Sequence, residues 1–167
     1  LDCSKLTGSL VIPKGVKIVG EYAFSWCGFK GNLTMHKGLD EIKAYAFSYT
    51  KFKGELNIPE TVTIIGDYAF QSTQFSGTLV LPDELISLGN SAFKNCSRLS
   101  GIVEIPQNII AVPSNLFSGC GMIEGIILHK GVEVIENSAF ANCYYISSIV
   151  CEAKNPPVIS SSSFSGV

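Results

Sequence analysis

Phenylalanine recurs along this chain at an almost constant interval of 23 or 24 residues. The series is Phe24, Phe47, Phe70, Phe93, Phe117, Phe140 and Phe164. Two other apolar positions keep the same phase, one eight residues and one five residues before each of the first six members. A period of this length is the pattern of a stacked solenoid, in which each unit buries its apolar side chains against its neighbours. The sequence therefore predicts about seven coils of 23–24 residues.

Each unit also contains two apolar residues two positions apart, a spacing that puts both on one face of an extended strand. The pairs are Leu10/Ile12, Leu33/Met35, Leu56/Ile58, Leu79/Leu81, Val103/Ile105, Ile126/Leu128 and Ile149/Cys151. In four units a proline follows directly and ends the strand, because it removes a ladder donor. A second apolar run precedes most of the Phe residues, and the Ala-Phe step favours a tight turn or one 3₁₀ turn. We expect one main parallel sheet, a second side of short strands or turns, and no long helix.

Several segments resemble the BspA-like leucine-rich repeats of bacterial surface proteins, whose units read approximately LxxIxIPxxVxxIGxxAFxxCxx. They include Leu56-Asn57-Ile58-Pro59, Ile65-Gly66-Asp67-Tyr68-Ala69-Phe70 and Ala92-Phe93-Lys94-Asn95-Cys96-Ser97-Arg98-Leu99. The resemblance covers nearly the whole chain and implies a β-rich, right-handed leucine-rich-repeat coil or horseshoe. It also implies a secreted or cell-surface protein that binds extracellular matrix proteins or other cells, with no cofactor and no catalytic centre.

The repeat predicts a single leucine-rich-repeat solenoid domain over residues 1–167, as a fragment of a longer repeat protein. Residues 149–167 form an atypical last repeat, because Asn155-Pro156-Pro157 replaces a Gly-Val step and a run of four serines precedes Phe164. Both ends fall within a repeat. The chain begins with Leu1 and carries no targeting segment, so we expect such a segment, or a lipid anchor, to lie outside it. The expected location is extracytoplasmic, secreted or on the cell surface.

Composition excludes several partner classes. Charged residues make up 16% of the chain, against about 25% in an average soluble domain, which argues against a disordered tail or a charged coiled coil. The net charge is −2, and Lys51 and Lys53 are typical of its scattered basic residues. We therefore expect no nucleic-acid partner. No apolar stretch reaches the ~18–20 residues of a membrane span, so we expect none in this chain.

Five cysteines occupy one slot of the repeat, three residues after the Phe or its equivalent: Cys3, Cys27, Cys96, Cys120 and Cys143. Thr50 and Thr73 fill the same slot in two other coils, which favours a buried row of small side chains. Cys96/Cys120 or Cys120/Cys143 lie within disulfide range across adjacent coils, although parallel side chains do not usually turn toward each other. A straight row cannot converge on a zinc ion. His36 and His129 stand four coils apart, about 19 Å, and we expect each to be exposed.

The sequence contains no nucleophile elbow, no phosphate-binding glycine loop and no matched carboxylate pair, so we expect no enzyme activity. The candidate binding surface is the strand face that alternates with the buried pairs. Its residues are Asn32, Thr34, Glu55, Asn57, Thr78, Val80, Ile102, Glu104 and Ile127. Their mixed small polar and β-branched character suits a broad protein contact. A second candidate is an aromatic stripe of Tyr22, Tyr45 and Tyr68, beside Trp26 and Tyr49, which can stack on a sugar or on itself.

The interpretation that these features favour is a non-enzymatic binding module whose sheet face contacts a host or matrix protein, or a glycan. Two alternatives remain at this point. The chain can act as a structural spacer or oligomerisation element that self-associates through its repeat ends. Less favoured is a carbohydrate-active enzyme, which is considered only because aromatic and acidic side chains share the surface.

Overall fold

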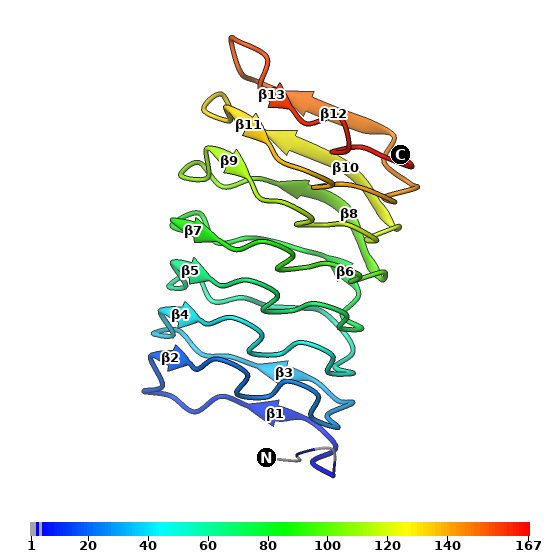
Figure 1. The fold of residues 1–167 in the computed structure, drawn as a ribbon. Helices are drawn as coiled ribbons and strands as arrows, with labels where there is room; N and C mark the ends of the chain where they lie inside the picture. Colours follow the sequence, from blue (N-terminus) through cyan, green and yellow to red (C-terminus); the bar gives the residue numbers. More distant parts are fainter. Residues whose placement is uncertain (1–2, 4) are drawn as a thin grey trace.

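Thirteen short strands stack into a solenoid (Figure 1). The structure is a computed structural model that describes Cys3 and residues 5–167. The strands are β1 (Leu10–Val11), β2 (Ile18–Val19), β3 (Leu33–Thr34), β4 (Glu41–Ile42), β5 (Ile64–Ile65), β6 (Gly77–Thr78), β7 (Ser87–Leu88), β8 (Leu99–Glu104), β9 (Ala111–Val112), β10 (Ile123–Leu128), β11 (Val134–Ile135), β12 (Ser148–Cys151) and β13 (Val158–Ile159). The described residues form no helix. The predicted β-rich repeat solenoid is confirmed.

The strands lie on two sides of the coil, and every pairing is parallel. On the main side β1 pairs with β3, and β6, β8, β10 and β12 form a four-stranded sheet. On the second side the orders are β2-β4-β5-β7 and β9-β11-β13. Equivalent residues pair across neighbouring coils, as Leu10 does with Leu33 and Ile126 with Ile149. The repeat period therefore sets the register.

The main side is interrupted at the third coil, where the expected strand around Leu56 and Ile58 is not formed. Leu56 is nevertheless buried and Glu55 and Asn57 are exposed, as the alternation requires. Burial of the apolar residue depends on the direction of its side chain and does not need the ladder hydrogen bonds. The coil can thus keep its place in the stack without strand pairing.

The recurring phenylalanines form a continuous stack through the core. Successive rings from Phe24 to Phe164 are 5.2–6.0 Å apart between centroids and nearly parallel. A second row, Phe29, Phe52 and Phe75, meets the first three rings edge to face at 6.1–6.3 Å. Sequence reasoning missed this second row, although its members are also 23 residues apart. The two rows together fill the N-terminal half of the core.

The segment around each Phe is a succession of tight turns, which is the first of the two alternatives, a tight turn or a 3₁₀ turn, expected from the sequence. The Ser25 N–H bonds the Tyr22 carbonyl at 3.2 Å, and the Cys27 N–H bonds the Phe24 carbonyl at 3.1 Å. Residues two before and two after the Phe have positive φ, 54° at Tyr22 and 60° at Trp26. A 3₁₀ helix needs negative φ at every residue, so it cannot continue through these positions.

The final pair of the strand pattern differs from its prediction, because Ile149 and Cys151 in β12 are exposed. These residues belong to the end coil, which is covered by a neighbour on one side only. Phe164 is half-buried for the same reason and stacks on Phe140 alone. Within the described part of the chain, no helix has the length and apolar character to cross a membrane.

Candidate functional site

The residues predicted for the sheet face do lie on the surface of the main side. Asn32, Thr34, Glu55, Asn57, Thr78, Val80, Ile102 and Glu104 are exposed, and Ile127 is half-buried. Strand pairing aligns them in rows, since Ile102 pairs with Gly125 and Glu104 with Ile127. The strand register thus brings residues that are 23 or more positions apart in the sequence together on one surface.

Four of these residues line a shallow hollow of about 180 Å³: Thr78, Val80, Ile102 and Glu104. Val80 is 73% exposed and Ile102 51% exposed. Asp83, Pro106 and Gln107 extend the hollow beyond the strand ends. Two exposed apolar side chains surrounded by polar and acidic groups can bury an apolar group of a partner while the surrounding polar atoms form hydrogen bonds.

The tyrosine stripe is a stack of rings along the turn side. The Tyr22 and Tyr45 centroids are 4.7 Å apart, and those of Tyr45 and Tyr68 are 4.6 Å apart. Partial burial raises the pKa of Tyr45, and the neighbouring Tyr68 and Tyr22 hydroxyls add to the effect. Each ring covers most of the face of the next, so the stripe mainly packs against itself and leaves ring edges accessible.

A second aromatic pair lies on the other flank of the same turn. Trp26 stacks on Tyr49 with centroids 4.1 Å apart, and Trp26 is 66% exposed. Between the two aromatic rows the Ser25 and Ser48 hydroxyls are 2.7 Å apart. This hydrogen bond links two neighbouring coils, and the Trp26 ring is largely exposed to solvent.

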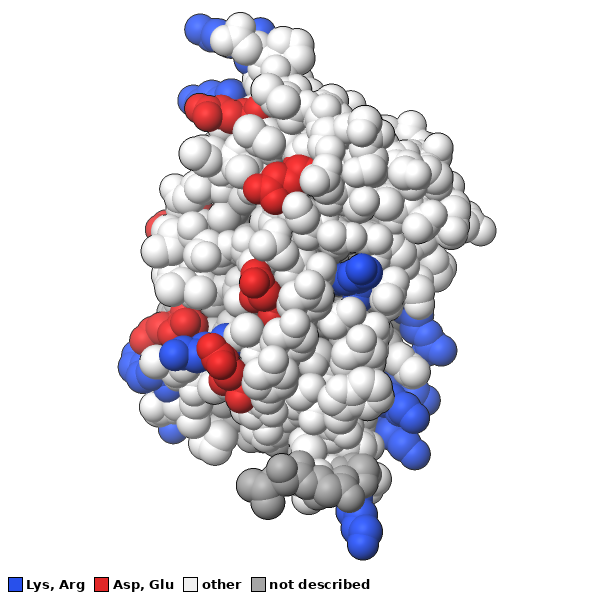
Figure 2. Space-filling view, viewed as in Figure 1, with Lys and Arg blue, Asp and Glu red and all other residues white. Residues whose placement is uncertain are grey.

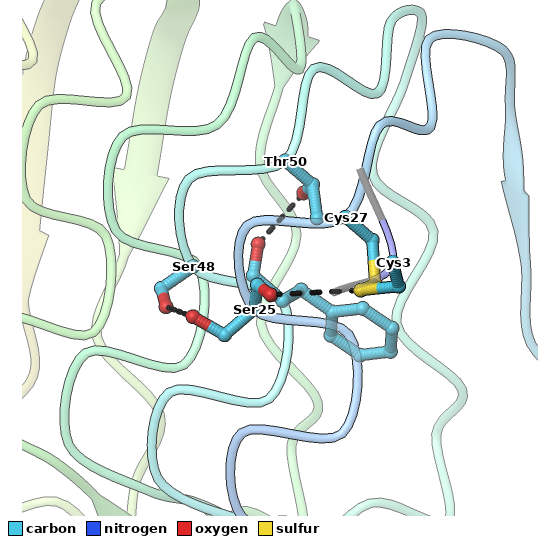
Figure 3. The surroundings of a disulfide bond; sticks show 6 residues. Cys3, Ser25, Cys27, Ser48 and Thr50 are labelled. Carbon is cyan, nitrogen blue, oxygen red and sulfur yellow. Dashed lines mark hydrogen bonds between the residues drawn. A yellow bond between two sulfur atoms is a disulfide. The ribbon is translucent and has the colours of Figure 1, made fainter. Parts of the chain in front are cut away.

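The cysteine row is buried as expected, but its first pair is bonded. Cys3 and Cys27 form a disulfide, with Cα atoms 4.7 Å apart (Figure 3). The expectation that stacked cysteines would not turn toward each other is wrong for this pair. Figure 3 also shows Thr50, in the same slot, donating to a main-chain carbonyl; the acceptor is Phe47 O at 2.7 Å.

Cys96, Cys120 and Cys143 stay free, and each thiol donates to the carbonyl of the core Phe one coil earlier. The sulfur–oxygen distances are 3.0–3.1 Å. All three thiols thus donate toward the preceding coil, and none of the three forms a disulfide. Burial raises the pKa of Cys120, and burial raises the pKa of Cys143 to about 12. Burial acts in the same direction on Cys96, but hydrogen bonds with Cys120 and Thr73 outweigh it and lower the pKa of that thiol. Cys120 and Cys143 are therefore poor nucleophiles, which fits a structural role.

The two histidines differ from the expectation that both are exposed. His129 is only 2% exposed. Its Nδ1 accepts the Gly131 N–H at 3.0 Å, and its Nε2 lies 3.1 Å from the Ile109 carbonyl oxygen, to which it donates. The ring fills the slot that prolines occupy in other coils, of which Pro82 and Pro106 are also buried. In the described part of the chain, no three His, Cys, Asp or Glu side chains converge as a metal site requires.

Comparison with known proteins agrees with this architecture. The sequence matches the family described as BspA type leucine-rich repeat region, in six copies over residues 2–77 and 63–167. No curated protein sequence matches it significantly. A leucine-rich repeat protein from Bacteroides ovatus is similar in fold, with a TM-score of 0.71 and 24% identity over 93% of this chain. One from Eubacterium ventriosum has a TM-score of 0.63 and 17% identity over 95% of this chain. The chain spans 38% and 64% of these two proteins.

Proposed function

Because the chain belongs to the BspA type leucine-rich repeat family, we propose that it is a non-enzymatic, extracytoplasmic binding module whose sheet face holds a partner protein. The partner is a host or extracellular matrix protein, or a protein on another cell. Proteins built from such repeats generally act as protein-interaction scaffolds, because their stacked coils present one continuous surface.

The observation that carries the proposal is the hollow formed by the fourth and fifth coils. Val80 and Ile102 line it and are both exposed, so the hollow offers apolar surface to a partner. Thr78, Glu104 and Asp83 supply polar groups around them. An apolar centre within a polar rim is the composition of a protein interface.

The extracytoplasmic part of the proposal is supported by the Cys3–Cys27 disulfide. Disulfides persist in oxidising compartments and are rare in the reducing cytosol. Among the free cysteines of the described residues, Cys96, Cys120 and Cys143 are buried and hydrogen-bonded, which protects them from oxidation there, whereas Cys151 is exposed.

The test is binding of the purified chain to immobilised fibronectin, fibrinogen, laminin and collagen, measured by surface plasmon resonance. The variant Thr78→Arg with Ile102→Arg places two charges in the hollow and should weaken binding by roughly tenfold or more. The matched control is Ile86→Arg with Ile110→Arg, because both isoleucines are exposed on the second side. Unchanged binding of the first variant to every ligand would remove the sheet face from the proposal.

The spacer or oligomerisation alternative is favoured by one observation. Val158 and Ile159 in β13 are exposed and pair on one side only, with β11. A second copy that added a strand there would bury them. Light scattering separates the two functions: a concentration-dependent rise in mass without binding to any panel protein would support the spacer.

A further inference from the structure

Basic residues gather along one edge of the solenoid. Residues 25–31, 48–54, 71–77 and 94–101, which follow the turns of the first four complete coils, contain no Asp or Glu. They carry Lys30, Lys51, Lys53, Lys94 and Arg98. In Figure 2 the right-hand edge carries blue side chains and no red ones, whereas blue and red side chains lie together on the opposite edge. The positive edge exists although the chain as a whole has a net charge of −2.

These charges are not neutralised by ion pairs among the residues that the structure describes. Among those residues the ion pairs are Lys17–Asp40 at 3.5 Å and Lys37–Glu60 at 3.1 Å, and neither includes a residue of the basic edge. Both lie in the loops that lead from a main-side strand to a second-side strand, away from the turn edge. The lysines of the basic edge are therefore available to an external anion.

A groove of about 410 Å³ lies on this edge, within the ~300–1,000 Å³ of small-ligand sites. It is lined by the stacked pair Trp26 and Tyr49, by Lys30 and Lys51, and by the polar residues Thr7 and Gln74. Lysine side chains and an exposed indole thus face the same space. This combination offers positive charge, hydrogen-bond donors and a flat apolar ring together.

Neither the backbone conformation nor packing in the core accounts for the large aromatic residues at Trp26 and Tyr49. Trp26 and Tyr49 have φ of 60° and 58°, a left-handed conformation that bulky residues adopt at a cost. In later coils the same slot holds residues that tolerate this conformation: Ser72, Asn95, Gly119, Asn142 and Gly166. Trp26 is also mostly exposed, so it contributes little to the core. The same conformation recurs at Tyr22, Tyr45 and Tyr68, so it belongs to the turn of the repeat, and what distinguishes Trp26 is the exposure of a large aromatic ring beside lysines.

We propose that this groove binds an acidic polysaccharide, with sugar rings lying against Trp26 and Tyr49 and carboxylate or sulfate groups paired with Lys30 and Lys51. The C–H face of a pyranose ring is apolar and packs on an aromatic ring, while its anionic substituents project from the edge. Lys53 occupies the slot of Lys30 one coil further on, about 4.8 Å away. Lys30, Lys51 and Lys53 thus form a short row of charge across two neighbouring coils, which fits a segment of an extended polymer. This site is separate from the sheet face.

The probes are heparin, which is sulfated, polygalacturonate, which carries carboxylates alone, and neutral dextran. We expect the chain to bind both acidic polymers and not dextran in isothermal titration, with affinity that falls as salt is raised. Binding of heparin alone would assign the groove to sulfate groups, still as an acidic polysaccharide site. Equal binding of dextran, or no binding of either acidic polymer, would overturn the proposal.

Two variants test the groove with residues that other coils already place in the same slots. Trp26→Asn with Tyr49→Ser uses the residues of Asn95 and Ser72, and Lys30→Ser with Lys51→Gln uses those of Ser76 and Gln74. Both should keep the circular dichroism spectrum of the parent chain. We expect each to lower affinity for the acidic polymer by roughly tenfold.

The control is Lys14→Gln with Lys130→Gln, which removes the same charge from exposed sites outside the groove. If this control weakens binding as much as the groove lysines do, or if the aromatic variant binds normally, attraction is non-specific and the site is refuted. Thr78→Arg with Ile102→Arg should leave polysaccharide binding unchanged. Groove variants that lose a matrix protein but keep the polysaccharide would assign the groove to protein and overturn the proposal.

Discussion

Truncation of a central phenylalanine should cost far more stability than truncation at the end of the stack. Phe70 is fully buried and its ring lies 5.4 Å from Phe47 and 5.4 Å from Phe93. It also meets Phe75 edge to face at 6.3 Å. Phe164, the matched control, is half-buried and has one aromatic contact, to Phe140 at 5.2 Å. The two sites share a slot of the repeat and differ in how completely neighbours enclose them.

The expected loss follows from these contacts. A buried Phe→Ala change costs about 3–5 kcal/mol, from lost transfer free energy and the cavity that remains. Each aromatic contact is worth ~0.5–1.5 kcal/mol beyond burial, so three contacts place Phe70→Ala at the upper end, about 5 kcal/mol. Phe164→Ala should cost about 2 kcal/mol, because part of its surface is already in water and only one aromatic contact is lost.

Urea unfolding followed by far-ultraviolet circular dichroism measures both variants. Because each coil contacts only its neighbours, a defect at Phe70 should also uncouple the two halves and broaden or split the transition. Phe164→Ala should keep the single transition of the parent chain. If the two variants lose equal stability, or if Phe70→Ala unfolds as sharply as the parent, the continuous aromatic stack is not what couples the coils.

Three further perturbations test other parts of the structure. A Cβ added at Gly66 would lie 2.6 Å from the Ala44 nitrogen of the preceding coil, whereas one at Gly20 meets nothing within 4 Å. Gly66→Ala should therefore lower the free energy of unfolding in urea by about 1–3 kcal/mol. If Gly20→Ala and Gly66→Ala were equally stable, this steric argument would be contradicted. Burial raises the pKa of the Cys143 thiol from 9.0 to about 12 in the folded chain. As pH rises, the unfolded chain therefore loses this thiol proton before the folded chain does. The free energy of unfolding should thus be highest below pH 9 and fall between pH 9 and 12. Cys143→Thr should lose less over that window, and parallel pH profiles would refute the assignment. His129→Ala should cost about 1–3 kcal/mol in thermal or urea unfolding by leaving two main-chain groups unpaired; a neutral change would show that water replaces the ring.

Much of the fold could be predicted from the period alone. Side chains that recur every 23 or 24 residues must lie above one another if the chain coils, so the Phe stack and the buried strand pairs follow from sequence. The alternation of Thr78, Leu79 and Val80 likewise predicts which side chains face outward, and the structure places them so. These features depend on apolar burial, which the order of residues specifies directly.

The turn conformations and hydrogen-bond partners could not be predicted in this way. The positive φ at Tyr22 and Trp26 allows their N–H groups to bond the carbonyls of Ala44 and Ser48 in the next coil. The buried position of His129 depends on the Ile109 carbonyl, which lies in a neighbouring coil. Each depends on atoms supplied by a neighbour, so no local pattern reveals it.

The candidate surfaces show the same division. Sequence alone determined the outward residues of the sheet face, the aromatic stripe and the absence of a recognisable catalytic motif, because these depend on residue type and period. It gave Lys30, Lys51 and Lys53 only as scattered basic residues. Tertiary structure decided that they line one edge, that Trp26 and Tyr49 stack beside them, and that Cys3 bonds Cys27. Stacking of coils converts a separation of 23 residues into a few ångströms, and only coordinates show which side chains then share a space.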